Sequence, residues 1–331
     1  MNFSIIIPVY NRPQELEELL TSLSLTTFQK PFEVVIVEDG SSVKADEIIE
    51  KFRTHLNLKY FYKSNTGPGD SRNFGMDQAT GDYFLLFDSD CIIPAEYLNQ
   101  VHQFLEKNPV DFFGGADTAD GSFSDFQKAV NFSMTSFITT GGIRGKDLKD
   151  FQPRSFNMGL SKEAFKKSGG FGEIHPGEDP DLTLRLWQMG FKSSFIPTAV
   201  VIHKRRISWE AFFNQTNKFG KARPILDLWH PHYKKITFWL PSLFIIGLDI
   251  TIILVFFGYY LLVYLFLFYF ILVIACSLIQ TKNLKIAFMS LATTLIQFYG
   301  YGLGFLKSWF FVHVLKKRPQ NAFPELFFIK K

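Results

Sequence analysis

Short apolar runs alternate with amphipathic segments over residues 3–108 of the chain. Strands are predicted where the apolar residues are continuous, in FSIIIPV, FEVVIVEDG, LKYFY and DYFLLFDSD. Helices are predicted where apolar residues recur every three or four positions, in PQELEELLTSL, ADEIIEKF, SRNFGMDQA and PAEYLNQVHQFLEKN, the last opened by Pro94. Near-continuous apolar strands that alternate with helices are typical of an α/β fold, with a mostly parallel sheet flanked by helices on both faces.

The middle of the chain is less regular. Residues 111–160 contain FFGGADTADGSFSDF and TTGGIRGKDLKDF, which are rich in Gly, Asp and Ser and are interpreted as loops. A helix is then predicted from about Asp181, and KSSFIPTAVVIH is interpreted as a late strand.

The last third of the chain is dominated by Phe, Leu, Ile and Tyr. Residues 236–280 form one apolar stretch, and a membrane span needs only about 20 residues. The stretch fits two helices that turn near Gly258, or an interfacial segment followed by a single span after Asp249, which we expect at an interface. A further apolar segment covers residues 286–315. Two crossings would return the C-terminus to the cytoplasm and three would leave it outside, so the number stays open.

Charge and composition support a cytosolic domain followed by a membrane region. Basic residues cluster in HKRRISW, NKFGKARP and HPHYKKITFW, immediately before the apolar tail, as expected at a cytoplasmic membrane face. No secretory signal precedes the first strand, and the two cysteines lie in different regions, so no disulfide is expected. We therefore predict a multi-pass membrane protein with a cytosolic domain at 1–225, a basic linker at 226–235, a membrane region of two or three helices at 236–315 and a basic tail at 316–331.

Polar side chains follow the predicted strands at the edge where parallel sheets bind ligands. Asn11 follows the first strand, Asp39 the second, and Asp88 and Asp90 the fourth. Positions i and i+2 of a strand face the same way, about 6.6 Å apart along the chain, so both aspartates are expected to face one bound ion. Carboxylate oxygens suit Mg²⁺ or Mn²⁺. The alternative is that Asp-Ser-Asp caps the next helix.

The order of the motifs resembles the inverting glycosyltransferases of family 2, which have the GT-A nucleotide-binding fold. The similarity runs through SIIIPVYNRPQELEELLTSL, VVIVEDGSS, NTGPGDSRNFGMDQATGDYFLLFDSD and FNMGLSKEAFKKSGGFGEIHPGEDPDLTLRLWQMGF, over about residues 3–225. The resemblance implies that Asp88 and Asp90 hold a divalent cation, Mg²⁺ or Mn²⁺, against the diphosphate of a nucleotide sugar.

The resemblance also implies a nucleotide site and a catalytic base. The nucleotide-binding positions are Pro8, Tyr10, Asn11, Asp39, Arg72, Asn73 and Asp88, with Asp39 accepting a hydrogen bond from uracil although Glu38 replaces a usual aspartate. Asp179 is expected to be the general base and Glu178 to orient it, against the alternative of simple helix capping, which we assign to Asp181.

Two further features concern the leaving group and the product. His203 and Arg206 are candidates for binding the phosphates or the metal, against headgroup contact or plain surface. Gln215 is not followed by the Arg-Trp pair of processive family members, so we predict transfer of one sugar per event.

Other nucleotide-binding classes fit poorly. PVYNRP lacks the glycines of a dinucleotide fold, GGIRGKD fails the P-loop spacing, and no zinc-type Cys/His spacing occurs. The sequence therefore predicts a membrane-anchored inverting glycosyltransferase with a UDP-linked donor and a lipid-linked or membrane-associated glycan acceptor. No nucleic-acid partner is expected. The alternative is a catalytically inactive membrane-anchored scaffold that binds nucleotide sugars.

Overall fold

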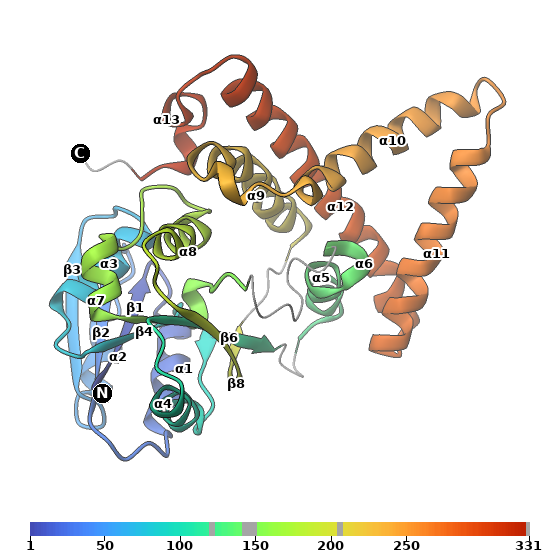
Figure 1. Cartoon of the computed structure of the whole chain (residues 1–331). Helices are drawn as coiled ribbons and strands as arrows, with labels where there is room; N and C mark the ends of the chain where they lie inside the picture. The colour runs from blue at the N-terminus through green and yellow to red at the C-terminus, as the bar shows by residue number, and fades with distance from the viewer. Residues whose placement is uncertain (119–122, 141–150, 204–207, 329–331) are drawn as a thin grey trace. The chain divides into compact units, whose positions relative to one another are not determined.

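The computed structural model describes residues 1–118, 123–140, 151–203 and 208–328, which form two compact units (Figure 1). The first unit comprises residues 1–120, 148–204 and 327–331, and the second comprises 121–147 and 205–326.

A mixed sheet of eight strands forms the centre of the first unit, in the order β3-β2-β1-β4-β7-β6-β8-β5. The neighbours β3–β2, β2–β1, β1–β4 and β6–β8 are parallel, whereas β4–β7, β7–β6 and β8–β5 are antiparallel. The strands are β1 (Phe3–Val9), β2 (Phe32–Asp39), β3 (Leu58–Lys63), β4 (Tyr83–Leu86), β5 (Cys91–Ile92), β6 (Phe112–Thr118), β7 (Met158–Ser161) and β8 (Ser193–His203). The five strands predicted from apolar runs are confirmed.

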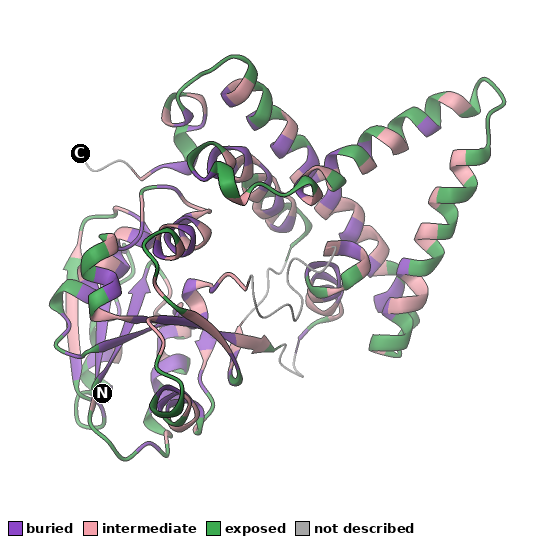
Figure 2. Cartoon of the chain, viewed as in Figure 1, coloured by how far each residue is buried: buried purple, intermediate pink, exposed green. Residues whose placement is uncertain are grey.

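Helices cover both faces of this sheet, as the continuous apolar strands predict. Ile5 and Ile7 of β1 belong to one core cluster, whereas Ile6 belongs to the cluster on the opposite face. The first cluster includes residues of α1 (Pro13–Ser24), α2 (Asp46–Phe52) and α4 (Tyr97–Lys107). The second includes residues of α3 (Pro68–Gln78), α7 (Lys162–Ser168) and α8 (Glu178–Gln188). Figure 2 shows the strands as largely buried between these layers.

The interpretation of residues 111–160 as loops was wrong for most of the described part. FFGGADT forms β6, MGLS forms β7, and residues 125–140 contain the helices α5 (Asp125–Thr135) and α6 (Phe137–Thr140) of the second unit. Small residues allow close backbone approach here, since a Cβ atom at Gly159 would lie 2.0 Å from the Phe113 ring. A smaller difference concerns α4, which begins at Tyr97 rather than at Pro94.

The second unit is helical. Its remaining helices are α9 (Trp209–Trp229), α10 (Leu240–Val255), α11 (Leu261–Thr281), α12 (Leu284–Trp309) and α13 (Pro319–Ala322), and a π-helical turn at Phe310–Val314 extends α12. Within the described residues, three helical segments are long and apolar enough to cross a membrane: Ile236–Val255, Leu261–Thr281 and Leu284–Val314. Of the two arrangements left open for residues 236–280, the structure has the two helices that turn near Gly258, which has a φ of +81° between α10 and α11. The boundary expected after residue 225 falls inside α9.

Candidate active site

Asp88 and Asp90 lie in a turn rather than on the strand that precedes them. β4 ends at Leu86, and the Cys91 N–H donates a hydrogen bond to the Asp88 carbonyl at 3.1 Å, which closes the turn. The expectation that strand spacing aligns the two carboxylates was therefore wrong. Each carboxylate has its own arginine: Arg72 donates to Asp88 at 2.5 Å, and Arg12 donates to Asp90 at 2.5 Å.

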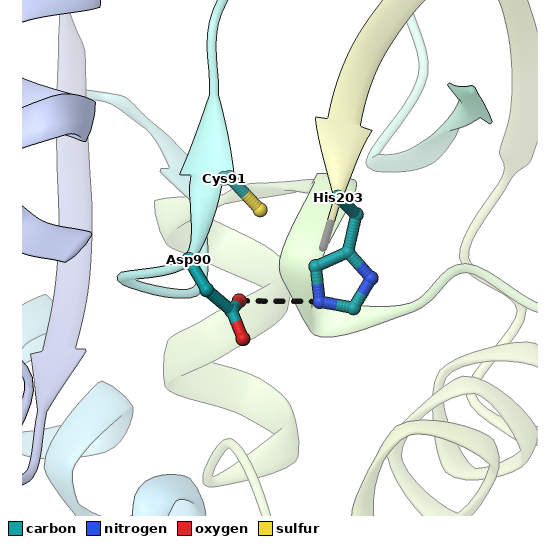
Figure 3. A group of neighbouring side chains, drawn as sticks. All are labelled: Asp90, Cys91 and His203. Carbon is teal, nitrogen blue, oxygen red and sulfur yellow. Dashed lines mark ion pairs between the residues drawn. The ribbon is translucent and has the colours of Figure 1, made fainter. Parts of the chain in front are cut away.

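His203 nevertheless brings the two aspartates to one place. It ends β8, which pairs antiparallel with β5 so that His203 stands opposite Cys91, the residue after Asp90. Its Nε2 lies 3.2 Å from Asp90 Oδ1 and 4.0 Å from Asp88 Oδ2 (Figure 3). The imidazole stacks on Phe156 with ring centres 4.2 Å apart, which fixes its orientation. His203 thus lies beside both aspartates, and its binding of a metal or of phosphate stays a prediction.

Asp90 and His203 offer ligand atoms for a divalent cation, and Asp88 Oδ2, 4.0 Å from His203 Nε2, is a further carboxylate oxygen beside them. Asp90 Oδ1 is buried against His203 Nε2, and His203 Nδ1 is buried without a hydrogen-bond partner among the described residues. Burial raises the pKa of Asp90, but the hydrogen bond and charge of His203 and the charge of Arg12 outweigh it, so the pKa lies well below its ordinary value and the carboxylate is ionised. Two carboxylate oxygens and one imidazole nitrogen would leave coordination positions for phosphate oxygens and water.

Cys91 also lies within reach of Asp90 and His203 but is a poor ligand for such a cation. The ligand atoms of Asp90, Cys91 and His203 lie within 4.8 Å of one another. Burial raises the pKa of the Cys91 thiol well above its ordinary value, and the thiol faces the Phe156 carbonyl at 3.6 Å. A protonated sulfur does not bind hard cations, so Asp88 is the better third ligand.

Arg72 joins the two acidic clusters of the site. It is 3% exposed, and beyond Asp88 its Nη1 lies 3.8 Å from Glu178 Oε1. Phe171 packs against its guanidinium, whose carbon lies 5.5 Å from the ring centre. Burial lowers the pKa of Arg72, but the charges of Asp88, Asp179 and Glu178 raise it by more, so the net pKa lies above its ordinary value. Arg72 is therefore a permanent cation between them.

Glu178 and Asp179 form the first turn of α8 and have opposite pKa shifts. Burial raises the pKa of Glu178, but the charge and hydrogen bond of His175, whose Nδ1 is 2.7 Å away, and the charge of Arg72 lower it below its ordinary value. Burial raises the pKa of Asp179 to about 7, and the charge of Glu178 adds to the rise. Neighbouring carboxyl groups with separated pKa values are typical of acid–base sites.

Asp181 has a structural role, although it is not the N-cap we expected. Gly177, with a φ of +128°, occupies the N-cap position of α8. Asp181 instead accepts from Arg185 Nε at 3.0 Å, and Arg185 donates to the carbonyls of Ser168 and Gly170.

Three predicted nucleotide-binding residues use their side chains to hold loops of the site. Both carboxylate oxygens of Asp39 are bonded, Oδ1 to Lys63 at 2.6 Å and Oδ2 to the Gly67 N–H at 2.9 Å. The Asn11 side-chain oxygen accepts from the N–H groups of residues 42 and 43. Asn73 exchanges two hydrogen bonds with the backbone of Phe171, at 2.8 and 2.9 Å. Their direct contact with a nucleotide stays a prediction.

The other predicted positions vary in accessibility. Pro8 is buried within β1, and Tyr10 is 52% exposed at the strand end. Arg206 lies outside the described residues. Sequence reasoning missed Arg12 and His175; a local signal existed for His175, which precedes the acidic pair in IHPGED, whereas Arg12 in YNRP lies far from Asp90 along the chain.

A pocket of about 290 Å³ lies beside this site. Its walls include Asp70, Asn73, Phe171, His175 and Phe328, but none of the proposed cation ligands. We therefore do not take it as the nucleotide site.

The family model for glycosyl transferase family 2 matches residues 4–169, which is half of the chain and includes the turn that holds Asp88 and Asp90. The chain belongs to glycosyl transferase family 2. The mixed sheet with helices on both faces is the GT-A-type core of this family.

Individual relatives match different lengths of the chain. It is 40% identical over 114 residues to the poly(ribitol-phosphate) β-N-acetylglucosaminyltransferase TarS of Staphylococcus aureus, a match to 34% of this chain and 20% of TarS. It is 23% identical over 261 residues to the glycosyltransferase GlyG of Streptococcus pneumoniae, covering 76% of this chain and 83% of GlyG. The crystal structure of TarS residues 1–349 matches with a TM-score of 0.50 and 25% identity, over 69% of this chain and 65% of that one.

Proposed function

We propose that this family member transfers one sugar, with inversion, from a nucleotide-diphospho-sugar to an acceptor hydroxyl at a membrane. The observation that carries the proposal is a single site with two functional ends. One end, Asp88, Asp90 and His203, fits a cation beside a diphosphate. The other end, Asp179, is a carboxyl group with a pKa of about 7. Arg72 lies between the two ends and contacts Asp88.

The donor end binds and neutralises phosphate. A bound Mn²⁺ or Mg²⁺ would stabilise the negative charge that develops on the leaving diphosphate. Asp88, Asp90 and His203 would hold it, and the imidazole favours Mn²⁺ over the harder Mg²⁺. The donor is expected to be UDP-linked from the resemblance at Asp39. UDP-N-acetylglucosamine is the first donor to test, because the relative TarS is named as an N-acetylglucosaminyltransferase.

The acceptor end removes a proton. The acceptor oxygen forms a bond to the anomeric carbon as the bond from that carbon to the phosphate oxygen breaks, and the bonding pair leaves with the diphosphate. The acceptor proton passes to Asp179, whose pKa of about 7 suits a base at neutral pH. Glu178, held ionised by His175 and Arg72, orients this group. The β linkage in the name of TarS agrees with inversion of an α-linked donor.

The acceptor is proposed to be lipid-linked or a membrane-associated glycan, presented at the cytoplasmic face of a multi-pass protein. Three apolar helical segments within the described part of the chain support membrane attachment. The basic residues next to them support the cytoplasmic orientation of the catalytic domain.

A donor panel tests this function. The purified protein in detergent, with Mn²⁺ and a membrane lipid extract, is incubated with UDP-, GDP- and CMP-linked sugars, and release of the free nucleotide is measured. We expect release from one UDP-sugar, dependent on the extract, and loss of release in Asp90→Asn. Binding of a nucleotide sugar without release under any condition would favour the inactive scaffold.

A further inference from the structure

The chain returns to the first unit after its last apolar helix. Phe327 forms an antiparallel bridge with Ile174, and the Phe328 N–H donates to the Glu173 carbonyl at 3.0 Å. The Phe328 ring also covers Gly67, where a Cβ atom would lie 2.4 Å from a ring carbon. Phe327 and Phe328, which follow the membrane region, are therefore part of the catalytic unit.

This return places the end of α12 on the catalytic side of the membrane. Residues 315–326 connect α12 and its terminal turn to Phe327, and they include Lys316, Lys317, Arg318 and Glu325. A segment with these charges, too short for a spanning helix, does not cross the hydrocarbon core, where charged side chains and unpaired backbone groups are costly. The C-terminal end of α12 thus lies on the same side as the first unit.

The start of α12 is held on the same side by a second tether. Lys285 Nζ lies 2.8 Å from Asp125 Oδ2, at the start of α5. Asp125 follows Thr118 of β6, in the first unit, by seven residues. Seven residues reach about 25 Å when fully extended, less than the thickness of the hydrocarbon core. Both ends of α12 therefore lie on the catalytic side, whatever the arrangement of the two units.

Polar helices cover one side of α12 along its length. Ser133 of α5 bonds Thr293 at 2.6 Å, and Asn217 of α9 donates to the Gly300 carbonyl at 3.0 Å. In an 18-residue apolar stretch of Leu284–Val314, 44% of the residues are buried. The buried share is 22% in Ile236–Val255, which contains α10, and 11% in Leu261–Thr281, which is α11. α9 carries Lys218, Lys221, Arg223 and Asp227, which is unlike a lipid-embedded neighbour.

The uncovered side of α12 is apolar and has basic ends. Its exposed large apolar residues lie toward the two ends: Leu284 and Phe288 near the start, and Leu303, Trp309, Phe310, Val314 and Leu315 near the end. Lys282 and Lys285 stand at one end, and Lys316, Lys317 and Arg318 stand at the other. An apolar face with lysines and arginines beside it is typical of a helix that lies in the surface of an anionic bilayer.

We propose that α12 does not cross the membrane but lies along its catalytic face, with the Leu284–Val314 face in the headgroup region of anionic lipids. Membrane insertion then belongs to α10 and α11, whose side chains are largely exposed (Figure 2). Of the two arrangements that hydropathy leaves open, the one with three crossings is excluded.

Site-specific labelling tests this topology. Lys282→Cys and Lys316→Cys are made singly and expressed in bacteria, with Lys107→Cys as the marker of the catalytic side. The parent protein gives the background from Cys91 and Cys276. A membrane-impermeant maleimide is applied to spheroplasts and to inverted vesicles. We expect all three positions to react from the same face. Reaction of residues 282 and 316 from opposite faces overturns the proposal.

A depth measurement tests the surface location itself. Phe288→Cys and Leu303→Cys carry a fluorophore, and quenching by lipids labelled at known depths is measured in vesicles that contain phosphatidylglycerol. The two positions are 15 residues apart, about 22 Å along a helix. We expect equal, shallow depths for an in-plane helix. A depth difference of 10 Å or more, or a position near the bilayer centre, contradicts the proposal; both the labelling and the depth results are independent of whether transfer activity is found.

Discussion

Replacing Asp179 by Asn is expected to stabilise the protein while abolishing its activity. Asp179 is held in surroundings that disfavour its charge, because burial and the neighbouring Glu178 raise its pKa from 3.8 to about 7. Asn keeps the shape and a hydrogen-bonding oxygen but carries no charge. It therefore removes both the proton acceptor and the destabilising carboxylate.

The size of the stability change follows from the pKa shift. The folded state binds the Asp179 proton more tightly than the unfolded chain, so stability falls as pH rises from 3.8 to about 7 and is then constant. The shift corresponds to about 4 kcal/mol at pH 8, and to about 2 kcal/mol at pH 5, where the unfolded carboxyl group is already ionised. These are upper bounds, since the side chain is partly exposed to solvent.

Thermal unfolding and transfer rates are measured together at both pH values. Asp179→Asn should raise the apparent Tm by about 5 °C at pH 8 and by clearly less at pH 5. Its rate should fall by a factor of about 10² to 10⁴. The parent rate should rise with pH through about 7 as Asp179 loses its proton.

Asp181→Asn is the matched control, two residues further along the same helix. It removes the charge that Asp181 contributes to its 3.0 Å pair with Arg185, so we expect a lower Tm at both pH values and an unchanged rate for the folded protein. The reasoning is refuted if Asp179→Asn keeps a rate within tenfold of the parent, or if its Tm gain does not depend on pH.

Three further changes probe the rest of the site. Asp90→Asn should lower the rate by about 10²-fold or more and raise the Mn²⁺ concentration needed for half-maximal activity; an unchanged metal titration contradicts its role as a ligand. His203→Asn should reduce the ratio of the rate with Mn²⁺ to the rate with Mg²⁺, and an unaltered ratio removes the imidazole from the cation site. His175→Gln removes the cationic partner of Glu178, so the pH–rate profile should shift while the donor KM stays the same; a loss of folding at every pH would instead show a purely structural histidine.

Local patterns predicted much of the first unit. The continuous apolar runs of β1 and β2 predicted burial on both faces, because each residue of such a run must meet a core on one side or the other. The leucines at positions 16, 19, 20 and 23 predicted the buried face of α1, and all four are at most 1% exposed. These elements could be predicted because the periodicity of their apolar residues is visible within a short stretch of sequence.

Long-range pairing was not predictable in the same way. β7 is a four-residue segment that lies between β4 and β6, and nothing local to MGLS indicates those partners. α5 carried a signal that was overlooked, since Ser124 and Gln127 form a capping box at its start.

In the site, too, local motifs identified some residues, whereas the contacts between distant segments could not be predicted. The acidic residues were found from their motifs, but the cationic partners of Asp88 and Asp90 come from other segments of the chain. Arg12 lies 78 positions before Asp90, and His203 reaches both aspartates only because β8 pairs with β5. The alignment of the aspartates came from this pairing rather than from strand spacing.

The most direct test of the central claim is the product itself. Wild-type protein and Asp179→Asn are incubated with UDP-N-acetylglucosamine, Mn²⁺ and a membrane lipid extract, and lipid and aqueous fractions are compared by mass spectrometry. If UDP-N-acetylglucosamine is inactive, the donor selected by the panel replaces it. We predict a lipid-fraction product heavier by one sugar residue, β-linked by NMR, that is absent with the variant. The same mass shift with both proteins, or an α-linked product, would contradict Asp179 as the base of an inverting transfer.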